Sequence, residues 1–156
     1  MKFEAYNIHP AIKRSLEERG FKRPTDIQHR AITPILAGED VLAIAQTGTG
    51  KTAAFAIPVL HLITEIKRNT RNKGIKCLVM VPTRELSIQI AEVFEQLARF
   101  TEITVMSLVG GVDQAPQIAK LNQGVDILIS TPGRMFDLIY QGHIKITKTD
   151  QKNYRA

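Results

Sequence analysis

Short apolar runs alternate with longer helical patterns along this chain, and this alternation limits its possible folds more than any other feature. The runs hold five or six mainly aliphatic residues with little polar alternation, as in strands buried on both faces. They lie at residues 41–45, 77–81, 103–108 and 125–129. Helical patterns lie at 51–67, 84–100, 113–122 and 133–140, with two more at 10–19 and 26–37. This repeated order predicts an α/β fold in which a parallel sheet carries helices on both faces.

Length and composition exclude several other classes of protein. The 156 residues fit about one domain, and 44% hydrophobic with 23% charged residues is typical of a globular chain. The longest mainly apolar stretch, 52–63, is too short to cross a bilayer, and residues 1–10 lack the apolar segment of a signal peptide. Cys77 is the only cysteine, so no internal disulfide forms. These features predict a cytoplasmic protein without a membrane partner.

The net charge of +6 is concentrated in one stretch of the chain. Residues 67–76 carry five cations and no acid, and the polar end of the chain carries several more. A basic balance of this kind is compatible with nucleic-acid binding. It is equally compatible with a solvated loop and tail, so charge alone leaves both interpretations open.

A glycine-rich loop joins the first apolar run to the helical pattern that follows it. Its glycines let the backbone curl so that N–H groups face phosphate oxygens, and the helix start adds its positive dipole end. Lys51 can reach the β- and γ-phosphates of a nucleotide, and the hydroxyl of Thr52 can hold Mg²⁺. A plain glycine-rich turn with an exposed lysine is the alternative. The position of the loop between strand and helix favours a nucleotide site formed by Ala45, Gln46, Thr47, Gly48, Thr49, Gly50, Lys51 and Thr52.

The loops that follow all four apolar runs are rich in Gly, Pro, Thr and Arg. Ligands of open parallel sheets bind beyond the carboxyl ends of the strands. The four loops, at 46–52, 82–85, 109–111 and 130–134, are therefore expected at one edge of the sheet.

Gln28 stands near the start of the second helical pattern and has two interpretations. It can close a capping box with Thr25, because its side chain can accept from the backbone N–H of that residue. It can also read adenine, because a side-chain amide offers one donor and one acceptor to the N6/N7 edge, whereas guanine presents two acceptors there. The two roles are compatible with each other.

Five motifs in order give the chain a resemblance to DEAD-box RNA helicases. Phe3, Gly20-Phe21 and Pro24-Thr25-x-Ile27-Gln28 resemble the Q motif of that family. Its phosphate loop, Ala-x-Thr-Gly-x-Gly-Lys-Thr, is similar to residues 45–52. The other three motifs are Pro-Thr-Arg-Glu-Leu at 82–86, Gly-Gly at 110–111 and Thr-Pro-Gly-Arg at 131–134. The resemblance covers residues 3 to about 146.

The resemblance implies an N-terminal RecA-like P-loop NTPase domain that binds ATP and Mg²⁺, and RNA through its backbone. It implies that Phe3 packs near the adenine and that Arg23 and Gln28 contact it. Lys51 and Thr52 would be the catalytic residues, with Thr52 holding Mg²⁺ through the nucleotide. The implied RNA contacts are Pro82, Thr83, Arg84, Gly110, Gly111, Thr131, Gly133 and Arg134. Surface ion pairs, for instance with Glu85 or Asp137, are the alternative for the two arginines.

The resemblance stops before the family's Asp-Glu-Ala-Asp strand, because the final residues are polar and basic with Asp150 as their only carboxylate. We therefore expect Q-motif helices at 1–40, a RecA-like core at 41–146 and a polar tail at 147–156, with the second RecA-like domain as a missing partner. The parent is expected to hydrolyse ATP and unwind RNA, and this piece only to bind nucleotide. The alternatives are a non-catalytic nucleotide- or RNA-binding module and a truncated partner-binding fragment. A GTPase is disfavoured: residues 147–150 mimic a guanine-reading pattern, but no Asp-x-x-Gly occurs.

Overall fold

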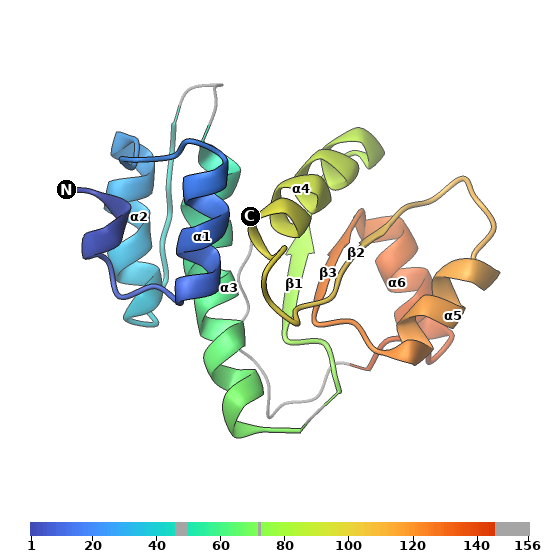
Figure 1. Ribbon diagram of the computed structural model, residues 1–156. Coiled ribbons are helices and arrows are strands. Elements are labelled where there is room, and N and C mark those ends of the chain that lie inside the picture. The colour runs from blue at the N-terminus through green and yellow to red at the C-terminus, as the bar shows by residue number, and fades with distance from the viewer. Residues whose placement is uncertain (46–49, 72, 146–156) are drawn as a thin grey trace. The chain divides into compact units, whose positions relative to one another are not determined.

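A computed structural model of the chain describes residues 1–45, 50–71 and 73–145 (Figure 1). The described helices are a 3-10 helix, Phe3–Ala5, and α1 Pro10–Glu18, α2 Asp26–Leu36, α3 Lys51–Asn69, α4 Arg84–Leu97, α5 Ala115–Gln123 and α6 Pro132–Tyr140. The described strands are β1 Cys77–Met80, β2 Val105–Leu108 and β3 Ile127–Ser130. All six predicted helices and three of the four predicted strands are confirmed. The predicted tail at 147–156, which includes the whole guanine-like pattern, lies outside the described residues.

The chain divides into two compact units. The N-terminal unit holds Met1–Arg71 and Val93–Glu102, and the sheet unit holds Asn72–Glu92 and Ile103–Ala156. Each unit is therefore described by itself below.

Helices α1, α2 and α3 form the core of the N-terminal unit. Ile12 of α1, Ile32 of α2 and Leu60 of α3 are each 0% exposed. Helix α2 begins at a capping box, in which Thr25 and Gln28 satisfy each other's backbone N–H groups. The helix start is thereby fixed next to Gln28, a residue predicted to contact the nucleotide.

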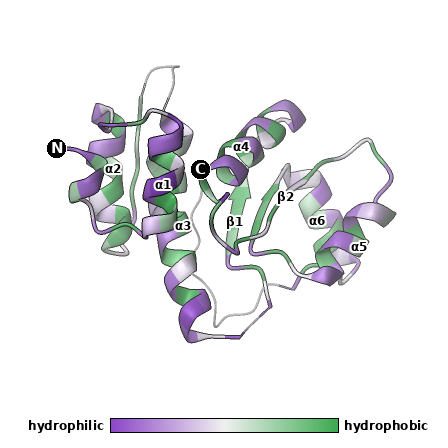
Figure 2. Cartoon of the chain, viewed as in Figure 1, coloured by the Kyte–Doolittle hydropathy of each residue, from purple (hydrophilic) through white to green (hydrophobic). Residues whose placement is uncertain are grey.

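The sheet unit holds three parallel strands in the order β1-β3-β2. Leu78 and Met106 both pair with Leu128, so their side chains share one face. That face packs against α5 and α6 in an apolar cluster that includes Met106, Leu128 and Leu138. On the other face, Ser87 of α4 bonds to Ser107 of β2 at 2.8 Å between hydroxyl oxygens. The predicted parallel sheet with helices on both faces is confirmed within this unit, and Figure 2 shows its strands to be mainly hydrophobic.

The prediction of a strand at residues 41–45 is wrong in this structure, since these residues form no strand. Leu42 is 90% exposed and Ile44 is 88% exposed. A strand is stabilised by hydrogen bonds and side-chain pairs from a neighbour, and no described residue pairs with this segment. The apolar composition predicted both burial and a strand here, and the structure shows neither.

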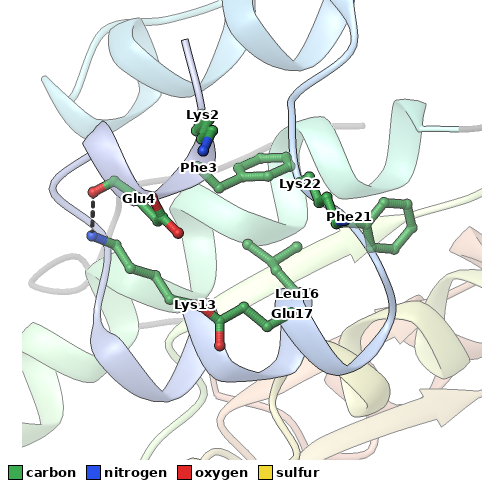
Figure 3. A pocket seen from close by; sticks show the side chains of 8 residues that line it. All are labelled: Lys2, Phe3, Glu4, Lys13, Leu16, Glu17, Phe21 and Lys22. Atoms are coloured by element: carbon green, nitrogen blue, oxygen red, sulfur yellow. Dashed lines mark hydrogen bonds between the residues drawn. The ribbon is translucent and has the colours of Figure 1, made fainter.

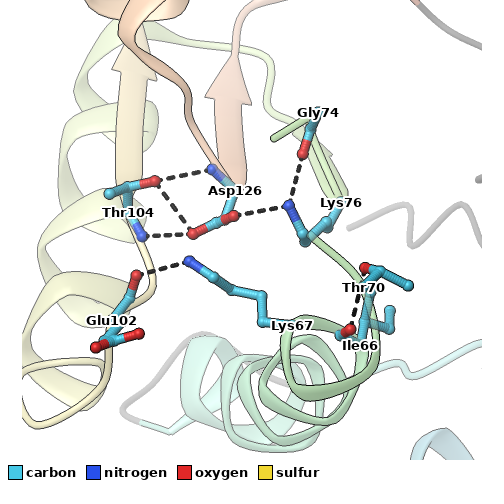
Figure 4. A network of polar contacts seen from close by, with 8 residues as sticks. All are labelled: Ile66, Lys67, Thr70, Gly74, Lys76, Glu102, Thr104 and Asp126. Carbon is cyan, nitrogen blue, oxygen red and sulfur yellow. Dashed lines mark hydrogen bonds and ion pairs between the residues drawn. The ribbon is translucent and has the colours of Figure 1, made fainter. Parts of the chain in front are cut away.

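Buried polar contacts join the amino ends of the three strands (Figure 4). Lys76, just before β1, donates to the Asp126 carboxylate at 2.9 Å, and both side chains are only 7% exposed. Asp126 precedes β3 and also accepts from the backbone N–H of Thr104, just before β2, at 2.9 Å. One carboxylate therefore links all three strands.

Several cationic side chains of the basic stretch at 67–76 form hydrogen bonds or ion pairs within the protein. Lys67 donates to the carbonyl of Glu102 at 2.8 Å, Arg68 lies 3.4 Å from Glu65, and Lys76 belongs to the buried pair described above. These contacts favour the structural interpretation of the stretch over a dedicated nucleic-acid patch.

His61 is expected to make the stability of the N-terminal unit depend on pH. Its Nδ1 accepts from the backbone N–H of His9 at 3.0 Å, and burial lowers the pKa of His61 from its ordinary value of 6.5, a shift that Glu65 opposes. Because the folded state binds this proton less readily than the unfolded state, the stabilisation is complete above about pH 6.5 and falls at lower pH. We expect urea-unfolding midpoints to decline below pH 6.5 and His61→Gln to flatten this profile. An unchanged profile in His61→Gln would contradict the assignment, and His143→Gln, at an exposed position, is the control.

None of the described helices is long and apolar enough to cross a membrane.

Candidate functional site

The three described loops beyond the strands lie at the same edge of the sheet. Met80 and Leu108, the last residues of β1 and β2, both pair with Ser130, the last residue of β3. The loops at 82–85, 109–111 and 130–134 therefore begin side by side, as predicted. In the fourth loop, residues 46–49 lie outside the described part of the chain, so its predicted members Gln46, Thr47, Gly48 and Thr49 have no described geometry.

Arg84 and the Gly-Gly loop lie close together within the sheet unit. A Cβ built on Gly111 would lie 3.8 Å from Nη1 of Arg84. Gly111 has a φ of +76°, in the left-handed region, whereas a Cβ on Gly110 would meet nothing within 4 Å. Gly111 thus allows the left-handed turn, and its lack of a side chain leaves space next to the Arg84 guanidinium.

Two helix starts face the same edge. Thr83 caps α4, because its Oγ1 accepts from the backbone N–H of Leu86 at 3.2 Å. Thr131 is the N-cap of α6, and Pro132 fills the first position, where no N–H is needed. The N–H groups of Gly133 and Arg134 belong to the first turn and have no acceptor within their own helix. Both helix starts can therefore donate to an anion.

Arg134 is held by neutral acceptors. Nη1 donates to Oε1 of Gln117 at 3.2 Å, and Nη2 donates to the carbonyl of Val112 at 3.0 Å. Among the described residues, no carboxylate pairs with Arg84 or Arg134. The ion pairs considered with Glu85 and Asp137 are therefore absent from the described part of the chain.

In the loop predicted to bind nucleotide, Gly50 is the last residue before α3. Its φ is +103°, and a Cβ there would lie 2.8 Å from Nε2 of Gln28 and 3.3 Å from Oγ1 of Thr25. Lys51 and Thr52 begin α3, and Nζ of Lys51 donates to the carbonyl of Ala45. Only glycine fits at position 50, because both the backbone angle and the approach of Gln28 exclude a side chain.

Gln28 connects the start of α2 with this junction. Its Oε1 accepts from the backbone N–H of Thr25 at 3.0 Å, and its Nε2 donates to the carbonyl of Gly50 at 3.2 Å. The side chain is buried, at 2% exposure. A primary amide has a second N–H and a second acceptor lone pair, so capping leaves hydrogen-bonding capacity for another group.

Phe3 lies beside a cavity of about 350 Å³ in the N-terminal unit (Figure 3). Its ring is 4% exposed, and its backbone N–H donates to the carbonyl of Lys22 at 3.4 Å. Leu16, Phe21 and Lys22 also line the cavity, but Gln28 and Arg23 do not. Arg23 is exposed. The structure thus brings Phe3 to the segment before Gln28 without forming one cavity from all three predicted base contacts.

Cys77 lies in β1 and its thiol is buried. Burial raises the pKa of the Cys77 thiol to about 12, so the thiol stays protonated near neutral pH. The described part of the chain holds no group of three or more His, Cys, Asp or Glu that could bind a metal ion.

Gln117 is a site residue that the sequence analysis missed. It lies in the first turn of α5, and its Nε2 donates to the carbonyl of Val109 at 3.1 Å while its Oε1 accepts from Arg134. A glutamine early in a helix is common, and its partners are distant enough in sequence to leave no local signal. Only the fold shows that it joins two of the predicted motifs.

Comparison with known proteins shows that the chain is similar to helicases. A family model described as DEAD/DEAH box helicase matches residues 25–154. The chain is 40% identical over 149 residues to the ATP-dependent RNA helicase DeaD of Mycobacterium tuberculosis, covering 95% of this chain and 26% of that protein. It is also 40% identical over 147 residues to the ATP-dependent RNA helicase eIF4A of Scheffersomyces stipitis, covering 94% of this chain and 36% of that protein.

A solved structure agrees with these relatives. The crystal structure of a hypothetical ATP-dependent RNA helicase from Sulfolobus tokodaii matches with a TM-score of 0.77 and 36% identity, over 88% of this chain and 38% of that one. The chain thus spans 26% to 36% of the length of these two curated relatives.

Proposed function

The chain belongs to the DEAD/DEAH box helicase family, and from this we propose that it is the part of an ATP-dependent RNA helicase that binds adenine nucleotide and the RNA backbone. The observation that carries the nucleotide half of the proposal is the bond between Gln28 and Gly50. It ties a side chain suited to adenine to the end of the loop suited to phosphates.

In this proposal the N-terminal unit binds the nucleotide. Gln28 reads the adenine with the amide N–H and lone pair that its capping bonds leave unused, Arg23 also contacts the base, and Phe3 packs near it. Lys51 neutralises the β- and γ-phosphates, and the loop from Ala45 to Gly50 surrounds them with backbone N–H groups. The sharp turn at Gly50 and the helix start behind it fit this role.

Thr52 is the residue that would hold Mg²⁺ through the nucleotide. It lies at the second position of α3, directly after Lys51 and two residues after Gly50. A hydroxyl at this point suits Mg²⁺, which prefers oxygen ligands and keeps several waters. The ion supplies neutralisation of phosphate charge.

The sheet unit would bind RNA through its backbone. Arg84 and Arg134 lack carboxylate partners among the described residues, and the starts of α4 and α6 offer N–H groups at the same edge. Pro82, Thr83, Gly110, Gly111, Thr131 and Gly133 shape these loops. Contacts to phosphate and sugar carry no base information, so the expected binding is independent of sequence.

ATP hydrolysis and RNA unwinding are proposed for the whole protein and not for these 156 residues alone. Phosphoryl transfer requires charge neutralisation and a positioned nucleophile, and the sequence contains no Asp-Glu-Ala-Asp. A second RecA-like domain would be the partner that completes the site. The second candidate function is a non-catalytic binding module. Arg84 and Arg134 have no carboxylate partners among the described residues, and they could bind RNA equally well in such a module.

Calorimetric titration with ADP, ATP and GDP tests the nucleotide proposal. We expect the chain to prefer adenine nucleotides, and Gln28→Ala to reduce that preference by about 10-fold or more, since a bidentate amide–base pair contributes about 1–3 kcal/mol of discrimination. Gln28→Glu is the matched variant, because it keeps an oxygen for the Thr25 N–H but loses the amide donor. It should lose adenine preference, and its stability must be measured alongside, because the carboxylate would face the carbonyl of Gly50.

Tight GDP binding, or an unchanged preference in Gln28→Ala, would contradict this assignment. A thermal melt by circular dichroism on each sample separates loss of binding from loss of folding.

A further inference from the structure

We propose that Gln117 is a positioning residue that holds the Gly-Gly loop and Arg134 in the arrangement needed to contact an RNA backbone. The inference rests on the proposed RNA-binding function and adds a residue outside the five motifs. Gln117 is half-buried in the first turn of α5 and belongs to the sheet unit together with both of its partners.

Two side chains hold both carbonyls that flank the glycine pair. Gln117 donates to the carbonyl of Val109, directly before Gly110, at 3.1 Å. Arg134 donates to the carbonyl of Val112, directly after Gly111, at 3.0 Å. Gln117 and Arg134 bond to each other at 3.2 Å. The result is a closed circuit of hydrogen bonds with the two glycines between its ends.

The chemistry of the circuit requires an amide at position 117. One end of the side chain must donate to a carbonyl, and the other must accept from a guanidinium, which has only donors. Glutamine meets both demands without adding charge. Arg134 is therefore oriented by two neutral acceptors, and no carboxylate of the described residues competes with a phosphate for it.

The glycines themselves are left open by this arrangement. No described residue accepts from the N–H of Gly110 or Gly111, and a Cβ on Gly110 would meet nothing within 4 Å. A loop that is fixed at both ends and open in the middle presents its N–H groups at low conformational cost to a ligand.

The test compares Gln117→Leu, Gln117→Glu and the control Gln123→Leu, which changes an exposed glutamine at the other end of the same helix. Binding of a fluorescein-labelled single-stranded oligouridylate is measured by anisotropy at several salt concentrations, below the onset of melting of every variant. We expect Gln117→Leu to weaken binding by about 5- to 10-fold, as for loss of one net hydrogen bond and its geometry. Gln123→Leu should match the unchanged chain.

Gln117→Glu is expected to change the salt dependence of RNA binding, which a purely structural role of Gln117 would leave unchanged. Its carboxylate would pair with Arg134, so the slope of log affinity against log salt should become shallower by about 0.7, the value for one single-strand phosphate contact. Gln117→Leu leaves the arginine unpaired and should change this slope less. Wild-type affinity and slope in both Gln117 variants would overturn the proposal.

A second measurement separates this inference from the proposed function. The backbone mobility of Gly110 and Gly111 is measured without RNA, from the NMR relaxation of their amide groups. We expect Gln117→Leu to increase this mobility and Gln123→Leu to leave it unchanged. Unchanged mobility overturns the positioning role. If Arg84→Ala and Arg134→Ala weaken RNA binding but Gln117→Leu does not, the inference fails and the function stands. If the unaltered chain binds no RNA, the proposed RNA function fails, and the role of Gln117 in RNA contact fails with it.

Discussion

Asp126→Ala is expected to lower the free energy of unfolding of the sheet unit by about 3–5 kcal/mol, the cost of leaving one partner of a buried ion pair uncompensated. The Lys76 ammonium would remain at a position where its side chain is 7% exposed. The backbone N–H of Thr104 would also lose its acceptor, which lies 2.9 Å away. The loss affects all three strands, because the carboxylate is bonded at the start of each. Urea unfolding followed by circular dichroism measures the change.

Three further variants show whether charge or shape causes this effect. Asp126→Asn keeps an acceptor for Thr104 but removes the charge, so its loss should be smaller. Lys76→Met combined with Asp126→Leu removes both charges and should recover much of the stability, since an apolar pair often replaces a buried ion pair without loss. Asp137→Ala, at an exposed position, should stay within about 0.5 kcal/mol of the unaltered chain. A similarly small effect of Asp126→Ala would mean that the pair is not buried in solution.

The helices and three strands could be predicted from sequence because their signals are local. Capping residues, proline at the first helical position and the 3.6-residue period all act within a few residues of each helix. The strands of the sheet are buried on both faces, and runs such as residues 125–129 carry that burial in their composition.

The segment at 41–45 shows where local signals end. Its composition is as apolar as that of β1, yet Leu42 and Ile44 are exposed in the structure. Composition reports whether a strand tolerates burial, whereas pairing depends on residues elsewhere in the chain.

The same limit applies to individual side chains. Lys67 and Lys76 looked like members of a basic patch, but their partners lie 35 and 50 residues away along the chain. Gln117 looked like an ordinary helix residue, and its link to Arg134 spans 17 positions. The motifs identified the loops of the candidate site, but only the fold identified the contacts that hold them.

Lys51→Ala is expected to weaken ATP binding by about 10- to 100-fold, because a hydrogen bond to a charged group contributes about 1.5–3 kcal/mol. The ammonium already lies at the loop, where it donates to the carbonyl of Ala45. The residue begins α3, so its removal also takes a positive charge from the helix end at which an anion is stabilised. Titration calorimetry with ATP and Mg²⁺ measures the loss.

Lys67→Ala is the matched control, because Lys67 lies near the other end of α3 and likewise donates to a backbone carbonyl. ATP affinity should be unchanged in this variant, and a comparable loss in both variants would mean that a general change of α3 causes the effect.

A hydrolysis assay with RNA on the same samples tests the proposal that these residues bind nucleotide and that hydrolysis requires the whole protein. We expect no RNA-stimulated hydrolysis by the unaltered chain. RNA-stimulated hydrolysis that Lys51→Ala abolishes would show that these residues hold a complete catalytic site, and the proposal that they only bind nucleotide would then be wrong.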